Sequence, residues 1–117
     1  MGDNILKKLD ELLVNNVRVS DTVARFGGEE FIILMPGTSV EEGFAFAEEL
    51  RKLIMAKRFI VGSVMLHITS SFGVSSIRDL MGSQTLEDYY YRADKALYLA
   101  KQSGKNRVEK ACVGAGV

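Results

Sequence analysis

Residues 25–31 carry the side chains of this sequence that are best suited to chemistry. Two glycines, Gly27 and Gly28, are followed directly by two acids, Glu29 and Glu30. Because glycine has no Cβ, the backbone of such a turn can come close to a bulky anionic ligand. Two carboxylates beside it can hold a divalent cation that bridges nucleotide phosphates. The pattern alone leaves a second interpretation open, an ordinary hairpin whose two acids are exposed to solvent.

Two predicted strands position this turn. Residues 22–26 and 31–35 are rich in β-branched, aromatic and aliphatic side chains, and the glycine pair between them predicts a tight hairpin. Residues 32–35 are continuously apolar, so we expect the second strand to be covered on both faces. Since adjacent strand residues point to opposite faces, Glu29 and Glu30 are not expected to have identical roles.

The rest of the chain alternates between helices and strands. Apolar residues at helical spacing predict one helix that begins at Asp3, one that begins with the capping box of Ser39 and Glu42, and one that ends at Gly104. Further strands are predicted over 58–61, 64–74 and 107–109. This order predicts an α/β (α+β) sandwich in which helices flank a mostly antiparallel sheet.

Composition limits the class of protein. The chain has 117 residues and 47% hydrophobic content, which fits one globular domain over 1–117 with a disordered tail at 111–117. Its 15 basic and 15 acidic residues give no formal net charge, which argues against a dedicated DNA or RNA binder. The single cysteine, Cys112, excludes a disulfide scaffold and a cysteine-based zinc site. With no long apolar run and no signal peptide, a cytoplasmic domain without membrane contact of its own is expected.

Residues 25–31 resemble the signature of the GGDEF family, the bacterial diguanylate cyclases, in its GGEEF form. Three other segments agree with that family in order and spacing: Gly2-Asp3 before the leucine-rich first helix, the strand 69–74, and the closing helix and turn 93–106. The resemblance runs from about residue 2 to residue 108. It implies a nucleotidyl cyclase-like fold that lacks the family's first strand and first helix.

The resemblance also implies a nucleotidyl transfer that belongs to bacterial second-messenger signalling. Two GTP molecules, one per subunit of a homodimer, would become cyclic di-GMP and pyrophosphate with the aid of Mg²⁺ or Mn²⁺. Such chemistry relies on positioning and charge stabilisation more than on covalent intermediates. Cyclic di-GMP would act both as product and as inhibitor.

Carried over residue by residue, the resemblance makes Glu29 the metal ligand and the proposed base for the attacking 3′-hydroxyl. Glu30 would be a second catalytic acid, and Gly27 and Gly28 would form the turn over the phosphates. For the two acids the alternative is an exposed position on a hairpin, and for the glycines it is turn geometry alone.

Three further positions match nucleotide contacts of the family. Asp3 would hydrogen-bond the guanine base, while Lys101 and Lys105 would contact the triphosphate, the second in place of a more usual arginine. The alternatives are a helix N-cap for Asp3 and complementation of a helix C-terminus for the two lysines. Residues 92–110 hold six basic and two acidic residues, which suits a polyphosphate ligand.

Arg18 and Asp21 match an Arg-x-x-Asp inhibitory site at which the product binds as a stacked dimer. The alternative is an exposed ion pair. In some members of the family an additional arginine on the next helix completes this site. Here that position in the register holds Glu49, and Arg51 lies two positions along.

The family's first strand, with a second metal-binding aspartate, and its first helix have no counterpart in these residues. The resemblance therefore predicts an N-terminally truncated domain that is weakly active or inactive. Two rival functions stay open. One is a non-catalytic module that binds cyclic di-GMP through Arg18 and Asp21, and the other is a structural dimerisation fragment that binds neither nucleotide.

Overall fold

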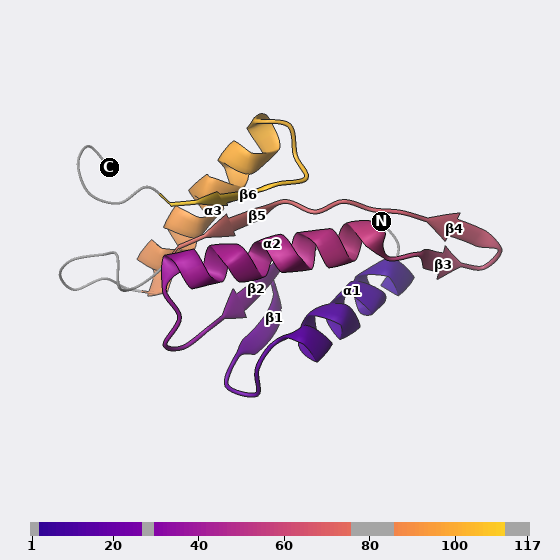
Figure 1. The fold of residues 1–117 in the computed structure, drawn as a ribbon, viewed down its shortest axis with the longest axis horizontal. Helices are drawn as coiled ribbons and strands as arrows, with labels where there is room; N and C mark the ends of the chain where they lie inside the picture. Colours follow the sequence, from indigo (N-terminus) through magenta and orange to yellow (C-terminus); the bar gives the residue numbers. More distant parts are fainter. Residues whose placement is uncertain (1–2, 27–29, 76–85, 112–117) are drawn as a thin grey trace. The chain divides into compact units, whose positions relative to one another are not determined.

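The computed structural model describes residues 3–26, 30–75 and 86–111, and its helices and strands alternate along the chain (Figure 1). In chain order the elements are α1 Asp3–Asn16, β1 Thr22–Phe26, β2 Glu30–Leu34, α2 Val40–Ala56, β3 Phe59–Val61, β4 Val64–Leu66, β5 Phe72–Val74, α3 Leu86–Gln102 and β6 Val108–Lys110. Gly27, Gly28, Glu29 and Cys112 lie outside the described residues, as does the predicted disordered tail beyond Ala111.

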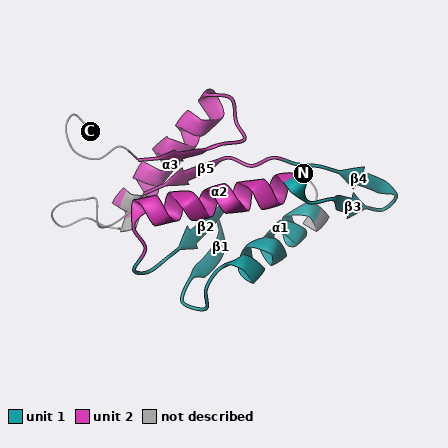
Figure 2. Cartoon of the chain, viewed as in Figure 1, with its two compact units in different colours: residues 1–37, 56–68 teal, residues 38–55, 69–117 magenta. Residues whose placement is uncertain are grey.

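The chain divides into two compact units (Figure 2). The first contains residues 1–37 and 56–68, and the second contains residues 38–55 and 69–117. Each unit therefore joins two separate stretches of the sequence. None of the described helices combines the length and the apolar character that crossing a bilayer requires.

The first unit contains one helix and two hairpins. β1 and β2 are antiparallel, with Thr22 opposite Leu34 and Phe26 opposite Glu30, and β3 and β4 form a second antiparallel pair. α1 contacts both β1 and β3. The core of this unit consists of buried apolar side chains: Ile5, Leu6, Leu13 and Phe59. The predicted first helix and hairpin are confirmed, although β2 begins one residue earlier than expected, at Glu30.

The expectation that the second hairpin strand is covered on both faces is wrong. Leu34 is 45% exposed, and residues 30–33 are only partly buried. Within the described part of the chain, β2 is hydrogen-bonded to β1 alone, so it lies at the edge of its sheet. An edge position leaves one row of backbone groups unpaired, and the two side-chain faces are covered only where other elements pack on them, so a run of apolar residues by itself does not reveal how far a strand is buried.

The second unit contains α2, α3 and a parallel pair of strands. β5 and β6 run side by side, with Phe72 opposite Val108, and α3 contacts both strands. The capping box that opens α2 is confirmed, because Ser39 N donates to Glu42 Oε1 at 3.0 Å and Glu42 N donates to Ser39 Oγ at 3.1 Å. The buried apolar side chains here include Val40, Ala47, Leu50, Ile54, Ala96, Ala100 and Val108.

Gly73 allows β5 and α3 to pack closely. A Cβ placed on this residue would overlap the backbone of Ala93 and Leu97 in α3. The strand and the helix can therefore approach one another only because residue 73 has no side chain.

The long strand predicted over 64–74 is divided in the structure. Residues 64–66 form β4, which pairs with β3 in the first unit, and residues 72–74 form β5, which pairs with β6 in the second. The two ends have different partners, so no single ladder can run through residues 67–71. The α+β class is confirmed, and the β1–β2 and β3–β4 pairs are antiparallel as expected, whereas β5–β6 is parallel.

Candidate functional site

The glycine-acid segment, residues 27–30, falls in the sequence between β1 and the start of β2. β1 ends at Phe26 and β2 begins at Glu30, and these two residues are paired across the strands, so residues 27–29 form the connection. Gly27, Gly28 and Glu29 themselves lie outside the described residues. Glu30 is the first residue of β2 and is partly buried. Of the predicted segment, the structure thus describes Glu30 alone, at the start of β2.

Arg18 and Asp21 form a closed ion pair in the loop between α1 and β1. The Arg18 guanidinium donates two hydrogen bonds to the Asp21 carboxylate, from Nη2 to Oδ1 at 3.0 Å and from Nε to Oδ2 at 3.3 Å. The backbone N–H of Arg18 donates a third, to Oδ2 at 2.9 Å, and Asp21 N donates back to Arg18 O at 3.0 Å. These bonds join the two residues as one rigid turn.

The two members of this pair differ in exposure. The side chain of Arg18 is 55% exposed, whereas that of Asp21 is 1% exposed. Hydrogen bonds from the Arg18 side chain lower the pKa of the Asp21 carboxyl below its ordinary value of 3.8, although burial opposes this shift. Arg18 Nη2 also donates to Pro36 O at 3.0 Å, beyond the end of β2. A ligand that approaches this loop would meet the guanidinium of Arg18, with the carboxylate behind it.

Lys101 and Lys105 lie at the C-terminal end of α3. Lys101 is in the last helical turn, and Lys105 follows the helix, where its backbone N–H donates to Ala100 O at 2.9 Å. Both side chains are exposed, and neither ammonium group forms a hydrogen bond or ion pair with another described residue. A cation at this end of a helix complements the helix dipole and is also available to an anionic ligand, so both interpretations of these lysines fit.

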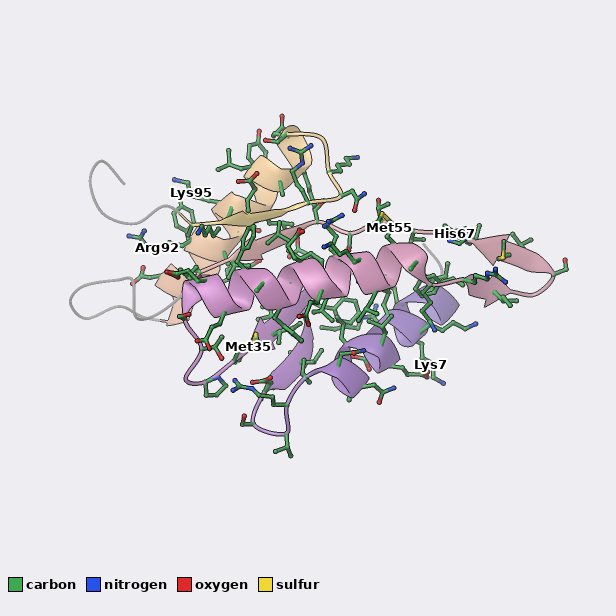
Figure 3. The ribbon with its side chains drawn as sticks, in the orientation of Figure 1. Lys7, Met35, Met55, His67, Arg92 and Lys95 are labelled. Atoms are coloured by element: carbon green, nitrogen blue, oxygen red, sulfur yellow. The ribbon has the colours of Figure 1, made fainter. Side chains whose placement is uncertain are left out.

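Three other basic residues of the segment 92–110 contact an aromatic ring or a carbonyl oxygen. Lys95 Nζ lies 5.5 Å from the centre of the Tyr91 ring, and Lys110 Nζ lies 5.5 Å from that of Phe44. Arg107 Nε donates to Lys105 O at 3.2 Å. In Figure 3 the side chains of Arg92 and Lys95 extend away from α3. The excess of positive charge predicted for residues 92–110 is thus present on this unit, and the exposed Lys101 and Lys105 lie together at the C-terminal end of α3.

The structure also reveals contacts around the turn after α3 that sequence reasoning missed. Asn106 N donates to Ser71 Oγ at 3.1 Å, and Asn106 Oδ1 accepts from Arg51 Nη1 at 3.1 Å. The sequence offers one signal for this turn, the asparagine Asn106 soon after Gly104 at the end of a helix. Asparagine tolerates the left-handed backbone conformation better than most residues.

The remaining predicted residues are only partly described. Asp3 is the first residue of α1, and its side chain is not among the described parts. No group of three or more His, Cys, Asp or Glu side chains that could hold a metal ion occurs within residues 3–26, 30–75 and 86–111. The predicted metal ligand, Glu29, lies outside those ranges. Carboxylates at positions 29 and 30 are nevertheless the type of donor that Mg²⁺ prefers.

Known proteins resemble this chain along almost its whole length. It is 42% identical over 110 residues to diguanylate cyclase DgcP of Pseudomonas aeruginosa, an alignment that covers 94% of this chain and 16% of that protein. It is 40% identical over 108 residues to diguanylate cyclase A of Treponema denticola, covering 92% of this chain and 28% of the relative. The chain thus spans less than a third of the length of either relative.

A solved structure gives the same fold. The active GGEEF domain of a diguanylate cyclase from Vibrio cholerae superposes with a TM-score of 0.84 at 35% identity, covering 96% of this chain and 69% of that one. The family description "Diguanylate cyclase, GGDEF domain" matches residues 1–107, which include parts of both compact units. This chain belongs to the GGDEF domain family.

Proposed function

We propose that this chain is a diguanylate cyclase domain, which condenses two GTP molecules into cyclic di-GMP and releases pyrophosphate in bacterial signalling. The observation that carries the proposal is the intact sequence Gly27-Gly28-Glu29-Glu30 between two strands that pair antiparallel, β1 and β2. Membership of the GGDEF family supports it. The relatives that match at 42% and 40% identity are both named diguanylate cyclases.

The proposed reaction is a displacement at phosphorus. The 3′-hydroxyl oxygen of one GTP bonds to the α-phosphorus of the other, the bond to the pyrophosphate oxygen breaks, and the hydroxyl proton passes to a base. Glu29 is the proposed base, with Glu30 as a second acid. Gly27 and Gly28 let the backbone approach the phosphates. Because each nucleotide serves as both nucleophile and electrophile, the proposal requires two copies of the domain, a homodimer.

Mg²⁺ or Mn²⁺ is the proposed cofactor, with Glu29 as the residue that would hold it. When bound, such an ion neutralises the charge that develops on the phosphate oxygens. Lys101 and Lys105 would contact the triphosphate, and Asp3 would accept hydrogen bonds from the guanine base. The exposure of the two lysines at the end of α3 supports the triphosphate assignment.

The direct test is cyclic di-GMP formation from GTP and Mg²⁺, followed by chromatography, in the unaltered chain and in Glu29→Ala. Glu11→Ala, at an exposed acid on α1, is the matched control. The proposal expects product that disappears with Glu29→Ala and persists with Glu11→Ala. Even a slow rate supports it if Glu29→Ala abolishes that rate. Product formation that is unchanged by Glu29→Ala contradicts the assigned role.

A second candidate function is a non-catalytic module that binds cyclic di-GMP through Arg18 and Asp21. The favouring observation is the closed pair itself, because its guanidinium is 55% exposed and held in one orientation. Because Nε and Nη2 of Arg18 donate to Asp21 and Pro36, a phosphate or a guanine edge would be met by the side of the guanidinium that faces away from those groups. Calorimetric binding of cyclic di-GMP that is lost in Arg18→Ala, together with no product from GTP, would favour this module. Binding of neither nucleotide would leave the structural dimerisation fragment.

A further inference from the structure

The turn that follows α3 has an unusual backbone. Lys105 has a φ of 61° and Asn106 a φ of 46°, so two consecutive residues other than glycine adopt the left-handed conformation. This conformation costs about 1–2 kcal/mol for an ordinary L-residue, because its Cβ comes too close to a carbonyl oxygen. Asparagine tolerates it, but the side chain of Lys105 forms no compensating hydrogen bond to its own backbone, and only the backbone N–H of Lys105 is fixed locally, by donating to Ala100 O at 2.9 Å. Neighbouring groups must therefore hold Lys105 in place.

Asn106 is the residue through which the turn is held. Its backbone N–H donates to Ser71 Oγ at 3.1 Å, beside the start of β5. Its side chain accepts from Arg51 Nη1 at 3.1 Å and donates from Nδ2 toward Met55 Sδ at 3.5 Å. Met55 is labelled in Figure 3, near the end of α2. Asn106 is thus fixed from β5 on one side and from α2 on the other, and all these residues belong to the second compact unit.

The hydrogen bonds of Arg51 orient its guanidinium toward Asn106. Its Nε donates to Glu48 Oε1 at 2.8 Å and its Nη2 to Glu48 Oε2 at 3.1 Å, a two-pronged pair within α2. This pair fixes the plane of the guanidinium, which leaves Nη1 to reach Asn106. The Arg51 side chain is 14% exposed and that of Glu48 is 30% exposed. The hydrogen bonds between them raise the pKa of Arg51 and lower that of Glu48 below 4.5.

We propose that Arg51 is a positioning residue for polyphosphate binding: paired with Glu48, it holds Asn106 and thereby sets the left-handed turn that presents Lys105 to the ligand. The inference rests on the proposed function, which assigns a triphosphate contact to Lys105. Arg51 touches no nucleotide in this assignment. Its guanidinium is occupied by Glu48 and Asn106, so it is not available to complete an inhibitory site with Arg18.

The inference requires that Arg51 and Lys105 act as one unit. A lysine ammonium is a point charge on a flexible stem, so its contribution to binding depends on where the backbone places it. If the turn is released, the ammonium stays on the molecule but loses its fixed position. Replacing Arg51 and removing the Lys105 ammonium should then weaken polyphosphate binding by similar amounts, and the two losses should not add.

The test uses guanosine 5′-[α,β-methylene]triphosphate, in which the α,β bridge blocks release of pyrophosphate. Its affinity for the unaltered chain, Arg51→Met, Lys105→Ala and the double variant is measured by calorimetry with Mg²⁺, beside GMP as a ligand without β- and γ-phosphates. We expect each single change to weaken the triphosphate analogue about tenfold, the double variant to be no worse, and GMP to be unaffected. Arg58→Met, at an exposed arginine, controls for loss of one positive charge.

A second variant keeps the test decisive if Arg51→Met folds poorly. Asn106→Gly removes the side chain that Arg51 holds while glycine still accepts a φ of 46°. We expect the same selective loss of the triphosphate analogue, with unchanged affinity for GMP. Equal losses for GMP and for the analogue would reveal a general structural role and overturn the inference.

The outcomes separate this inference from the proposed function. If Lys105→Ala weakens the analogue but neither Arg51→Met nor Asn106→Gly does, the positioning role fails and the triphosphate assignment stands. Additive losses in the double variant would also overturn the positioning role. If Lys105→Ala changes nothing, or the unaltered chain does not bind the analogue, both the assignment and the inference fail.

Discussion

Two arginine–carboxylate pairs, each three residues apart, occur in the two compact units and are built in opposite ways. In the first unit Arg18 is 55% exposed and covers the Asp21 carboxylate, which is 1% exposed. In the second unit the Arg51 side chain is 14% exposed and the Glu48 carboxylate 30% exposed. One pair lies in a loop and the other within a helix. The two ion pairs therefore orient their guanidinium groups differently. Arg18 is largely exposed to solvent, whereas Arg51 donates to Asn106.

The largest expected difference between the pairs is in folding stability. Arg51→Met leaves Glu48 and Asn106, both partly buried, without their main hydrogen-bond donor. We expect the free energy of unfolding to fall by about 2 kcal/mol, the usual cost of leaving such groups unpaired. Urea unfolding followed by circular dichroism measures it, with Arg58→Met as the control that stays within about 0.5 kcal/mol. A loss for Arg51→Met no larger than for the control would remove the distinction between the pairs.

Replacement by glycine rather than alanine should change folding stability in opposite directions at Lys105 and at Arg18. Lys105 has a φ of 61°, so we expect Lys105→Gly to be about 1 kcal/mol more stable than Lys105→Ala. None of the described residues 17–21 has a positive φ, so Arg18→Gly should be less stable than Arg18→Ala, because glycine loses more entropy on folding. Unfolding of the four variants measures both differences. The same sign at both positions would show that the strain at residue 105 has no energetic consequence.

Truncation of Arg18, the exposed member of the first pair, should have a small effect on stability. In Arg18→Ala the Asp21 carboxylate keeps the hydrogen bond from the backbone N–H of residue 18, which measures 2.9 Å here. Because the Arg18 side chain lies on the solvent side of this carboxylate, its truncation lets water replace the guanidinium, so we expect a loss of about 0.5 kcal/mol in the free energy of unfolding. The same variant should nevertheless lose cyclic di-GMP binding if this loop is the product site. A loss of stability as large as that in Arg51→Met would mean that Arg18 has a structural role as well.

How far the sequence predicts these features depends on the distance between the residues involved. The capping box of Ser39 and Glu42 and the Arg18–Asp21 pair are local, and both form as their spacing implies, although the burial of Asp21 does not follow from spacing. The contact of Arg51 with Asn106 joins positions 55 residues apart, and a single sequence carries no periodic signal for such a contact.

The same limit applies to the strands. The alternation within residues 64–74 predicts one strand, but only pairing with distant partners decides where a ladder stops. The apolar run of β2 likewise predicts burial on both faces, but the burial of a strand depends on which distant elements pack against it, and Leu34 is 45% exposed. For residues 27–30 the roles proposed for Glu29 and Glu30 come from the family resemblance, and the pairing of Phe26 with Glu30 places Glu30 alone in the fold.

The smallest expected difference between the pairs is in their response to acid, and its sign follows from the two carboxyl pKa values. Each pKa is lowered in the folded chain, that of Glu48 below 4.5 and that of Asp21 below 3.8, mainly by hydrogen bonds from the paired arginine. A carboxyl with a lowered pKa binds fewer protons when folded, so its contribution is complete above its unfolded pKa and disappears as the pH falls through the folded value. The Glu48 contribution should therefore begin to decline at a higher pH than that of Asp21.

Urea midpoints measured in small pH steps between 6 and 3 should resolve this order. Glu48→Gln should be less stable to urea than the unaltered chain at neutral pH, and this difference in stability should shrink from about pH 4.5 downward. The corresponding difference for Asp21→Asn should stay constant until the pH is below about 3.8. Glu11→Gln, at an exposed acid, should follow the unaltered chain throughout. If Asp21→Asn converges first, the buried carboxylate is held less firmly than the three hydrogen bonds it accepts from Arg18 imply, and the contrast between an exposed and a buried guanidinium loses its energetic basis.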